Sequence, residues 1–150
     1  MARRIKIAFP DRGIEAIASL EDEQAPLTCD HVWKSLEQPL EGIFNHGHES
    51  GPEIWFYMPP APDLPNENAT LFPEVGDILF YHYDGQLPRG EKIFDMGIYY
   101  GRGGKGLLAV GWVPGNLFAT VTENLKGVQE AARFINDHGP QRATISRVGD

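Results

Sequence analysis

Short strand-like segments recur from one end of the chain to the other, and this pattern most constrains the fold. Arg4–Phe9 alternates polar and apolar residues, the period-2 pattern of a half-buried strand, and a turn at residues 11–13 joins it to Ile14–Leu20. Further strands are predicted at residues 42–58 (two, around a turn at 46–52), 78–83, 92–100, 107–113, 117–121 and 142–148. Strands near both ends favour a closed or nearly closed β barrel, because pairing the first with the last removes exposed edges.

Two helices and one long loop are predicted between these strands. The first helix begins at Pro26, a residue suited to a first helical turn, and ends before Pro39. The second follows Asn124, a plausible N-cap, and stops at Gly139-Pro140. Apolar residues fall at helical spacing in both: Cys29, Val32, Trp33 and Leu36, then Leu125, Val128, Ala131, Ala132 and Ile135. Residues 59–73 hold five of the twelve prolines and predict a surface loop.

Size and charge narrow the classes of partner. The 150 residues are expected to form one domain, residues 1–150. A net charge of −8 with scattered basic residues opposes nucleic-acid binding, and no apolar run approaches the roughly 20 residues that cross a bilayer. The basic start is not followed by a signal-peptide stretch, so a cytoplasmic protein without a membrane partner is expected. Cys29, the single cysteine, excludes an internal disulfide and is interpreted as an inert core residue.

Several short segments together resemble a known family. They are Ala25-Pro26-Leu27-Thr28, Val32-Trp33-Lys34-Ser35-Leu36, His46 with Ser50-Gly51-Pro52-Glu53, Gly76-Asp77-Ile78, Tyr100-Gly101 and Gly115-Asn116-Leu117-Phe118-Ala119. Over most of its length the chain is similar to the DUF3830 family, uncharacterised bacterial proteins of the cyclophilin-like superfamily. The resemblance implies a mostly β fold, a closed cyclophilin-like barrel of about eight strands with two short helices. It implies no particular reaction. The Phe-His-Arg-Val and Gln-Gly-Gly segments of true cyclophilins do not occur here, so prolyl isomerase activity is not expected.

The His46-Gly47-His48 turn, followed by Glu53, is one candidate site. Two histidines at i and i+2 of a strand project to one face and can reach one metal ion, and a carboxylate from the next strand could complete the site. The pattern is similar to the first metal motif of the cupins, but the flanking glycines and the downstream histidine of that motif are missing. We therefore expect neither metal nor cofactor, and keep His46, His48 and Glu53 as an alternative metal site.

A second hypothesis uses the same residues without metal, in a pocket at the mouth of the barrel. Aromatic walls with a few placed polar groups are typical of small-molecule pockets. The candidate ligand-binding residues are His46, His48, Ser50, Glu53, Trp55, Tyr100, Arg102 and Asn116, with Tyr57, Tyr81, Tyr83 and Asp95 as further candidates. Half of the aromatic residues must face a core rather than a ligand, because successive strand residues alternate between faces.

Residues 101–106 spell Gly-x-Gly-x-x-Gly, a pattern that needs separate interpretation. A dinucleotide site requires a strand before the glycines and a helix after them. Leu107-Leu108-Ala109-Val110 follows without a helix start signal, so a flexible loop is predicted. Arg102 in this loop could offer a positive charge to an anionic ligand.

Three functions follow from these observations. The first is a barrel that binds a small anionic or amide-bearing metabolite in a histidine and aromatic pocket. The second is an enzyme that uses His46, His48 and Glu53 as acid/base groups or metal ligands. The third is a self-associating structural module, because symmetric homo-oligomers are common among small domains.

Overall fold

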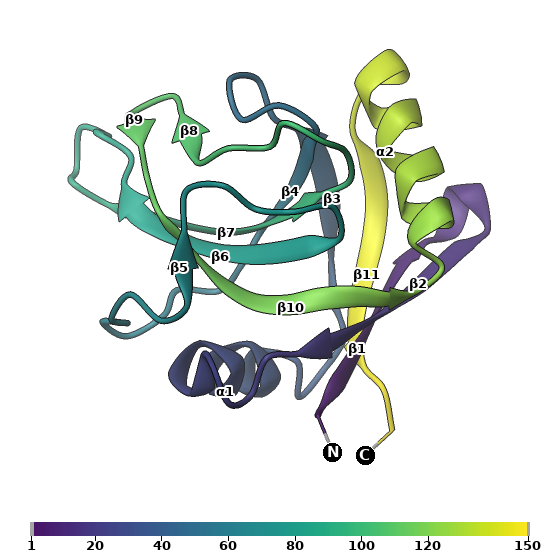
Figure 1. The fold of residues 1–150 in the computed structure, drawn as a ribbon, viewed down its shortest axis with the longest axis horizontal. Helices are drawn as coiled ribbons and strands as arrows, with labels where there is room; N and C mark the ends of the chain where they lie inside the picture. Colours follow the sequence, from purple (N-terminus) through teal and green to yellow (C-terminus); the bar gives the residue numbers. More distant parts are fainter. Residues whose placement is uncertain (1, 150) are drawn as a thin grey trace.

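In residues 2–149, which the computed structural model describes, eleven strands and two α-helices follow one another (Figure 1). The strands are β1 (Arg4–Phe9), β2 (Ile14–Leu20), β3 (Leu40–His46), β4 (Glu53–Tyr57), β5 (Ala69–Thr70), β6 (Asp77–Asp84), β7 (Lys92–Tyr99), β8 (Leu107–Leu108), β9 (Gly111–Trp112), β10 (Gly115–Glu123) and β11 (Gln141–Arg147). The helices are α1 (Pro26–Ser35) and α2 (Leu125–His138), and a single 3₁₀ turn, Pro10–Arg12, joins β1 to β2. Both predicted helices and most of the predicted strands are therefore present.

Eight of the strands close into an antiparallel barrel. Their order is β2-β1-β11-β3-β4-β7-β6-β10, and β2 pairs with β10 to complete the circle. The predicted pairing of the first and last strands is confirmed: β1 lies against β11, with Ile7 opposite Ile145. The fold is thus mostly β, a closed eight-stranded barrel with two helices, as expected.

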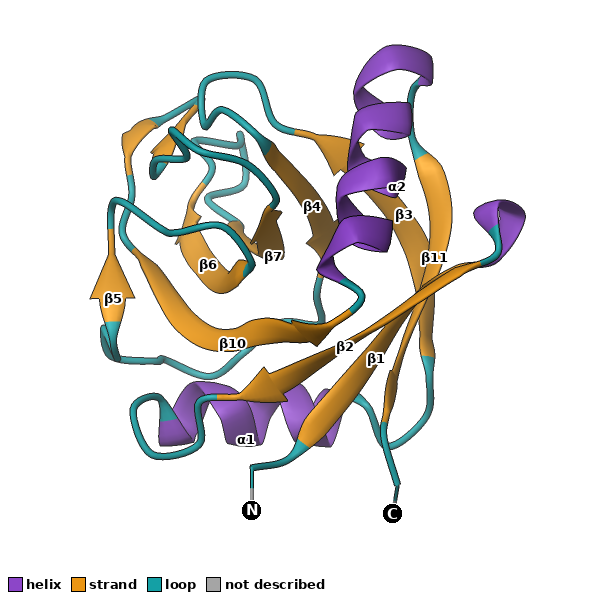
Figure 2. Ribbon diagram, turned by 45° about the vertical axis from the view of Figure 1, so that its right-hand side comes forward, coloured by secondary structure: helices purple, strands orange, loops and turns teal. Residues whose placement is uncertain are grey.

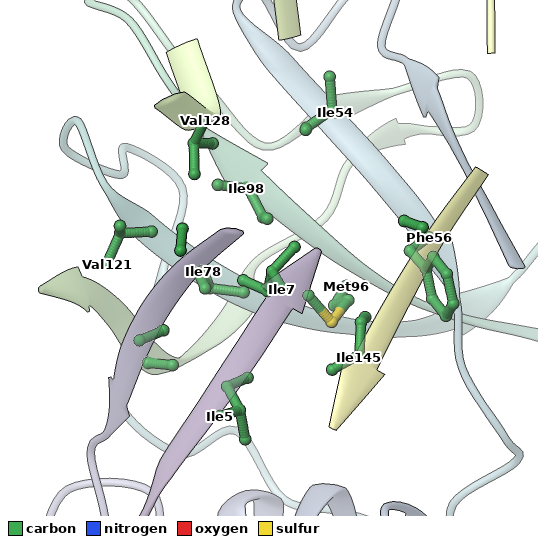
Figure 3. Packing of buried hydrophobic residues seen from close by; sticks show 14 of the residues in the cluster. Ile5, Ile7, Ile54, Phe56, Ile78, Met96, Ile98, Val121, Val128 and Ile145 are labelled. Carbon is green, nitrogen blue, oxygen red and sulfur yellow. The ribbon is translucent and has the colours of Figure 1, made fainter. Parts of the chain in front are cut away.

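The barrel interior is filled by the inward-facing side chains, which are every second residue of each strand. Figure 3 shows Ile5, Ile7, Met96 and Ile145 converging from three strands. All four are fully buried. Burying a side chain of this size contributes roughly 1.5–3 kcal/mol, so the interior supplies most of the drive for closure.

The two helices cover different parts of the barrel (Figure 2). Helix α2 contacts β2, β3 and β4 and adds Val128, Ala131 and Ile135 to the interior core. Its predicted N-cap is confirmed, because the Asn124 side chain accepts a hydrogen bond from the Gly127 amide (3.1 Å). Helix α1 lies against β10 and buries Cys29. Within residues 2–149 no helix is both long and apolar enough to cross a membrane.

Three segments differ from the sequence prediction. The predicted strand at residues 107–113 is a hairpin of two-residue strands, β8 and β9, that forms a separate sheet. The predicted strand at residues 117–121 is the nine-residue β10, in which two register shifts hide the alternation. The proline-rich loop at residues 59–73 contains β5, which pairs with the edge of β10.

Candidate functional site

Strands β4, β7 and β6 lie side by side in the barrel wall and present two different faces. Their inward residues, such as Ile54, Met96 and Ile98, belong to the barrel core. Their outward residues form a second layer, in which Tyr81 and Tyr99 pack in a separate buried cluster. Period-2 alternation produces both layers, since every second residue points away from the core.

Glu53, at the start of β4, lies in this outer layer and is only 2% exposed. The Ser50 hydroxyl donates to its Oε1 (2.7 Å), and Gly97 on β7 leaves the space that the carboxyl occupies, because a Cβ atom there would overlap it. Burial raises the pKa of Glu53 to about 7, against the opposing hydrogen bond from Ser50. Glu53 therefore holds a proton to a higher pH than an exposed glutamate does.

Asp95, on β7, is a second buried carboxyl in the same layer. It is 6% exposed, and burial with the charge of Glu53 raises its pKa well above the usual value. Within the described chain no group donates a hydrogen bond to its carboxylate, and no fully buried side-chain polar atom lacks a partner. The Asp95 oxygens therefore reach the space in front of the strand rather than a protein partner.

Two tyrosines support the carboxyls from behind. The Tyr81 and Tyr99 hydroxyls share a hydrogen bond (2.6 Å), and the Tyr99 hydroxyl also donates to the Lys105 carbonyl (3.3 Å). Burial first, and then the charge of Glu53, raises the pKa of both phenols. Both stay neutral in the physiological range and act as hydrogen-bonding groups, not as acids.

A cavity of about 180 Å³, which we call the wall cavity, opens in front of these groups. It lies between the outer face of β4, β6 and β7, the turn after β3 and the β8–β9 hairpin, which Figure 1 shows above β6 and β7. The lining residues are Gly47, His48, Glu49, Ser50, Glu53, Trp55, Tyr57, Tyr83, Ile93, Asp95, Leu107, Leu108 and Ala109. The Trp55 and Tyr57 rings meet edge to face, with their centroids 4.9 Å apart. The cavity is therefore on the barrel wall, not at the barrel mouth where the sequence placed it.

The structure brings four of the eight candidate residues together in the wall cavity: His48, Ser50, Glu53 and Trp55. Tyr57, Tyr83 and Asp95, further candidates from the sequence, line it as well. The other four candidates lie elsewhere.

His46 and Tyr100 form a pair outside the cavity lining. His46 Nε2 lies 2.7 Å from the Tyr100 hydroxyl, and His46 Nδ1 lies 2.7 Å from the Gly47 carbonyl. A carbonyl only accepts, so Nδ1 carries a proton and donates to it. Both ring nitrogens are engaged, and the pair holds the turn that carries His48.

Asn116 and Arg102 are also away from the cavity. Asn116 is buried beside α1, where its amide donates to Thr28 Oγ1 and the Pro65 carbonyl and its oxygen accepts from the Glu67 amide (3.0 Å each). It is a structural residue that ties β10 to the proline-rich loop and α1. Arg102 is exposed and does not line the wall cavity.

The alternative metal site finds no support in the geometry. Across residues 2–149 no group of three or more His, Cys, Asp or Glu side chains is placed to hold a metal ion. The engaged nitrogens of His46 explain why His46, His48 and Glu53 do not form one. Strand β3 ends at His46, so the alternation that would place both histidines on one face does not continue to His48.

Two other motifs have structural roles. Residues 101–106 form a loop that leads directly into strand β8, in place of the helix that a dinucleotide site requires. Cys29 is fully buried, its thiol donates to the Phe118 carbonyl (3.3 Å), and burial raises its pKa to about 12. Such a thiol is a weak nucleophile.

The sequence interpretation missed the part of the site contributed by the β8–β9 hairpin. Leu107, Leu108 and Ala109 close one side of the wall cavity, and Leu108 packs on the outer tyrosine cluster. No local signal marks two-residue strands, and the contact is long-range. Tyr99 was also missed, although the spacing of Asp95, Gly97 and Tyr99 places all three on one strand face.

The fold and the cavity define a small closed β barrel with an acidic, aromatic pocket on its wall. The chain belongs to the DUF3830 family, described as proteins of unknown function, whose model matches residues 7–147. No curated protein matches the chain. A solved structure described as "Structure of McbB in complex with tryptophan" shares the fold, with a TM-score of 0.71 at 18% sequence identity. The match covers 97% of this chain but only 45% of that chain, so this chain spans less than half the length of that relative.

Proposed function

We propose that the protein binds a small molecule in the wall cavity through N–H donors, carried by an amide or an amine. The observation that carries the proposal is the Asp95 carboxyl, which is more than nine-tenths buried, accepts no hydrogen bond and lines the cavity beside Glu53. A buried acceptor of this kind is costly unless a partner satisfies it. A bound ligand with N–H groups is such a partner.

The dimensions of the cavity limit the size of this molecule. A cavity of about 150 Å³ holds one benzene molecule, so the 180 Å³ here accommodates a single ring or a short chain with one polar group. Trp55, Tyr83, Leu107 and Leu108 offer the apolar surface for its carbon atoms. No Lys or Arg is among the lining residues in the described chain, so the amide-bearing version of the expected ligand has more support than the anionic one.

The shared barrel adds limited support from relatives. We assign the barrel to the cyclophilin-like superfamily on the resemblance of its motifs, and we propose binding without prolyl isomerase activity. The McbB structure is described as a complex with tryptophan, an amino acid with an aromatic ring and an ammonium group, which makes aromatic compounds with N–H groups reasonable probes. At 18% identity this likeness concerns the fold.

A thermal-shift screen tests the proposal. Benzamide, benzylamine, benzyl alcohol, benzoate and tryptophan share an aromatic ring and differ in their polar group. A ligand at 100 times its dissociation constant adds about 2.7 kcal/mol to the stability of the folded state, so the melting temperature should rise by several degrees for the N–H compounds. An unchanged melting temperature with all five probes at high concentration would contradict the proposal.

Acid/base catalysis in the same cavity is a second candidate function. It is favoured by Glu53, whose pKa of about 7 suits a general acid or base at neutral pH, and by His48 in the same lining. The two candidates differ in one measurement: an enzyme turns over a bound probe, whereas a binding protein returns it unchanged. Mass spectrometry of probes recovered after long incubation distinguishes them.

Cytoplasmic location and self-association remain predictions from the sequence. Exposed apolar side chains, including Phe72 and Trp112, whose rings lie 5.9 Å apart, supply a surface on which two copies could meet. Light scattering of the purified protein tests this, and a strict monomer would leave the self-association hypothesis without support.

A further inference from the structure

The floor of the wall cavity carries acidic groups without a matching protein cation. Glu53 and Asp95 lie at its base and Glu49 lies at its rim, whereas the described lining contains neither Lys nor Arg. A buried carboxyl is ordinarily paired with a cation or satisfied by several donors. Glu53 accepts a bond from Ser50, but Asp95 accepts none from the described residues and faces the cavity. The described lining of the wall cavity therefore supplies no cationic side chain to pair with Asp95.

The walls suit an organic cation. Trp55, Tyr57 and Tyr83 surround the space in front of the carboxyls, and Tyr57 is 62% exposed, which leaves its ring free to contact a ligand. Aromatic faces attract cations through their quadrupole. Aromatic rings that flank a carboxyl are therefore complementary to an ammonium group on a carbon frame.

We propose that the occupant of the wall cavity is a small organic ammonium ion, a protonated amine on a single ring or short chain. Its N–H groups donate to Asp95 and Glu53, and its carbon frame lies against Trp55 and Tyr83. This inference rests on the proposed function, and it narrows the ligand from an amide or amine to a cation.

Binding of a cation here is coupled to a proton. Four groups face Glu53: Ser50 from the turn, Tyr99 and Asp95 from β7, and Tyr81 from β6. Three further polar residues line the same cavity: His48, Glu49 and Tyr83. None of them is a fixed cation. An ammonium ion brings a positive charge next to a carboxyl that is partly protonated when the cavity is empty. The Glu53 O–H bond then breaks, its proton passes to solvent, and the carboxylate pairs with the ammonium ion.

Calorimetric titration with four matched probes tests the inference. Benzylamine, benzamide, benzyl alcohol and benzoate are titrated at pH 6.0 and 8.0, each in two buffers of different ionisation enthalpy. We expect benzylamine to bind at least tenfold more tightly than benzamide at pH 8.0, and benzoate to bind most weakly. At pH 6.0 benzylamine should release protons when it binds, and its affinity should be lower than at pH 8.0, because Glu53 must first lose its proton.

Two variants and a control distinguish the effect of carboxylate charge on probe affinity from the effect of cavity shape. Glu53→Gln keeps the volume and removes the charge, so it should weaken benzylamine at least tenfold, weaken benzamide by a much smaller factor and reduce proton release. Asp95→Asn should likewise weaken benzylamine and gives a second test if Glu53→Gln does not fold. Glu41→Gln removes the same formal charge at an exposed position of β3 outside the cavity and should change neither probe.

The outcomes are distinguishable. If benzamide binds and benzylamine does not, the inference that the ligand is a cation is wrong, while the proposed small-molecule function stands. If benzylamine binds without proton release and Glu53→Gln has no effect, the inference is also overturned. If none of the four probes binds, the proposed function fails together with the inference.

Discussion

A carboxyl that is 2% exposed in a barrel wall costs free energy, and Glu53 reduces this cost in two ways. It accepts a hydrogen bond from Ser50, and it takes up a proton more readily than an exposed glutamate because burial disfavours the charged form. Gly97 makes the position possible, since any side chain there would displace the carboxyl. Ser50 and Gly97 thus accommodate an ionisable side chain in the barrel wall.

The buried carboxyl predicts how stability depends on pH. The pKa of Glu53 is about 7 in the folded protein against 4.5 for the free side chain, so the folded state binds more protons between these values. Stability is therefore full below about pH 4.5 and is lost as pH rises through 7, by roughly 3 kcal/mol for a shift of this size. Asp95, whose pKa is also raised, adds a loss of the same sign.

Urea unfolding between pH 5 and 8.5 measures this dependence. Glu53→Gln should make the decline shallower, because only Asp95 then remains as a buried carboxyl that loses its proton, whereas Glu41→Gln should keep the wild-type slope. A free energy of unfolding that rises between pH 5 and 8 in the wild type would contradict a raised pKa of Glu53 in the folded protein.

At the residue scale the sequence identified about half of the candidate site. His48, Ser50, Glu53 and Trp55 follow one another closely in the chain, so a local pattern was enough to group them. His46 and Tyr100 were grouped with them because alternation assigns residues to two faces without saying which face is the interior. Only barrel closure decides that, and it is a property of all eight strands.

At the element scale most of the fold was predictable, for a physical reason. Strands such as β1 and β2 pair with sequence neighbours, and their alternation and turn residues are local signals. The β8–β9 hairpin gives no such signal. It is held to distant segments by backbone bonds, from Gly106 to Leu71 (2.7 Å) and from Lys105 to Ser50 (3.0 Å). Elements fixed by long-range contacts need the assembled barrel before they can be recognised.

Asn116 shows how one side chain joins three elements, and it gives a prediction of stability without binding. Its amide satisfies groups from α1 and the proline-rich loop, and Glu67 in that loop accepts from the Thr28 amide (2.8 Å) at the first turn of α1. Asn116→Ala leaves these buried groups unpaired, so it should lower the free energy of unfolding by about 1–3 kcal/mol. Ligand affinity should stay within twofold, because Asn116 does not line the wall cavity.

Chemical denaturation and calorimetry on the same samples check this. Arg102→Ala is the matched control, since Arg102 is an exposed loop residue and its loss should change stability by less than about 0.5 kcal/mol. A tenfold loss of benzylamine affinity in the folded Asn116→Ala variant would return Asn116 to the list of ligand-binding residues.

Over the whole molecule, barrel closure creates two unequal cores. The interior core draws on all eight barrel strands and both helices, whereas the outer cluster contains Leu79, Tyr81 and Tyr99 with a few partly buried neighbours. The wall cavity belongs to the smaller one. A ligand site on a thin outer layer can open without disturbing the barrel, because regions with little buried apolar surface unfold locally at low cost.

Amide hydrogen exchange tests this division of stability. We expect amides at residues 103–112 to exchange through local opening of the β8–β9 hairpin, at a lower free energy than amides of β6 and β7, which should exchange only when the barrel unfolds. Saturating benzylamine should slow exchange in the hairpin, since Leu107 and Leu108 line the wall cavity, and should slow β6 and β7 only by as much as it raises global stability. Equal protection of hairpin and barrel strands without ligand would mean that the outer layer is part of the cooperative core. Ligand entry would then require the barrel wall itself to move.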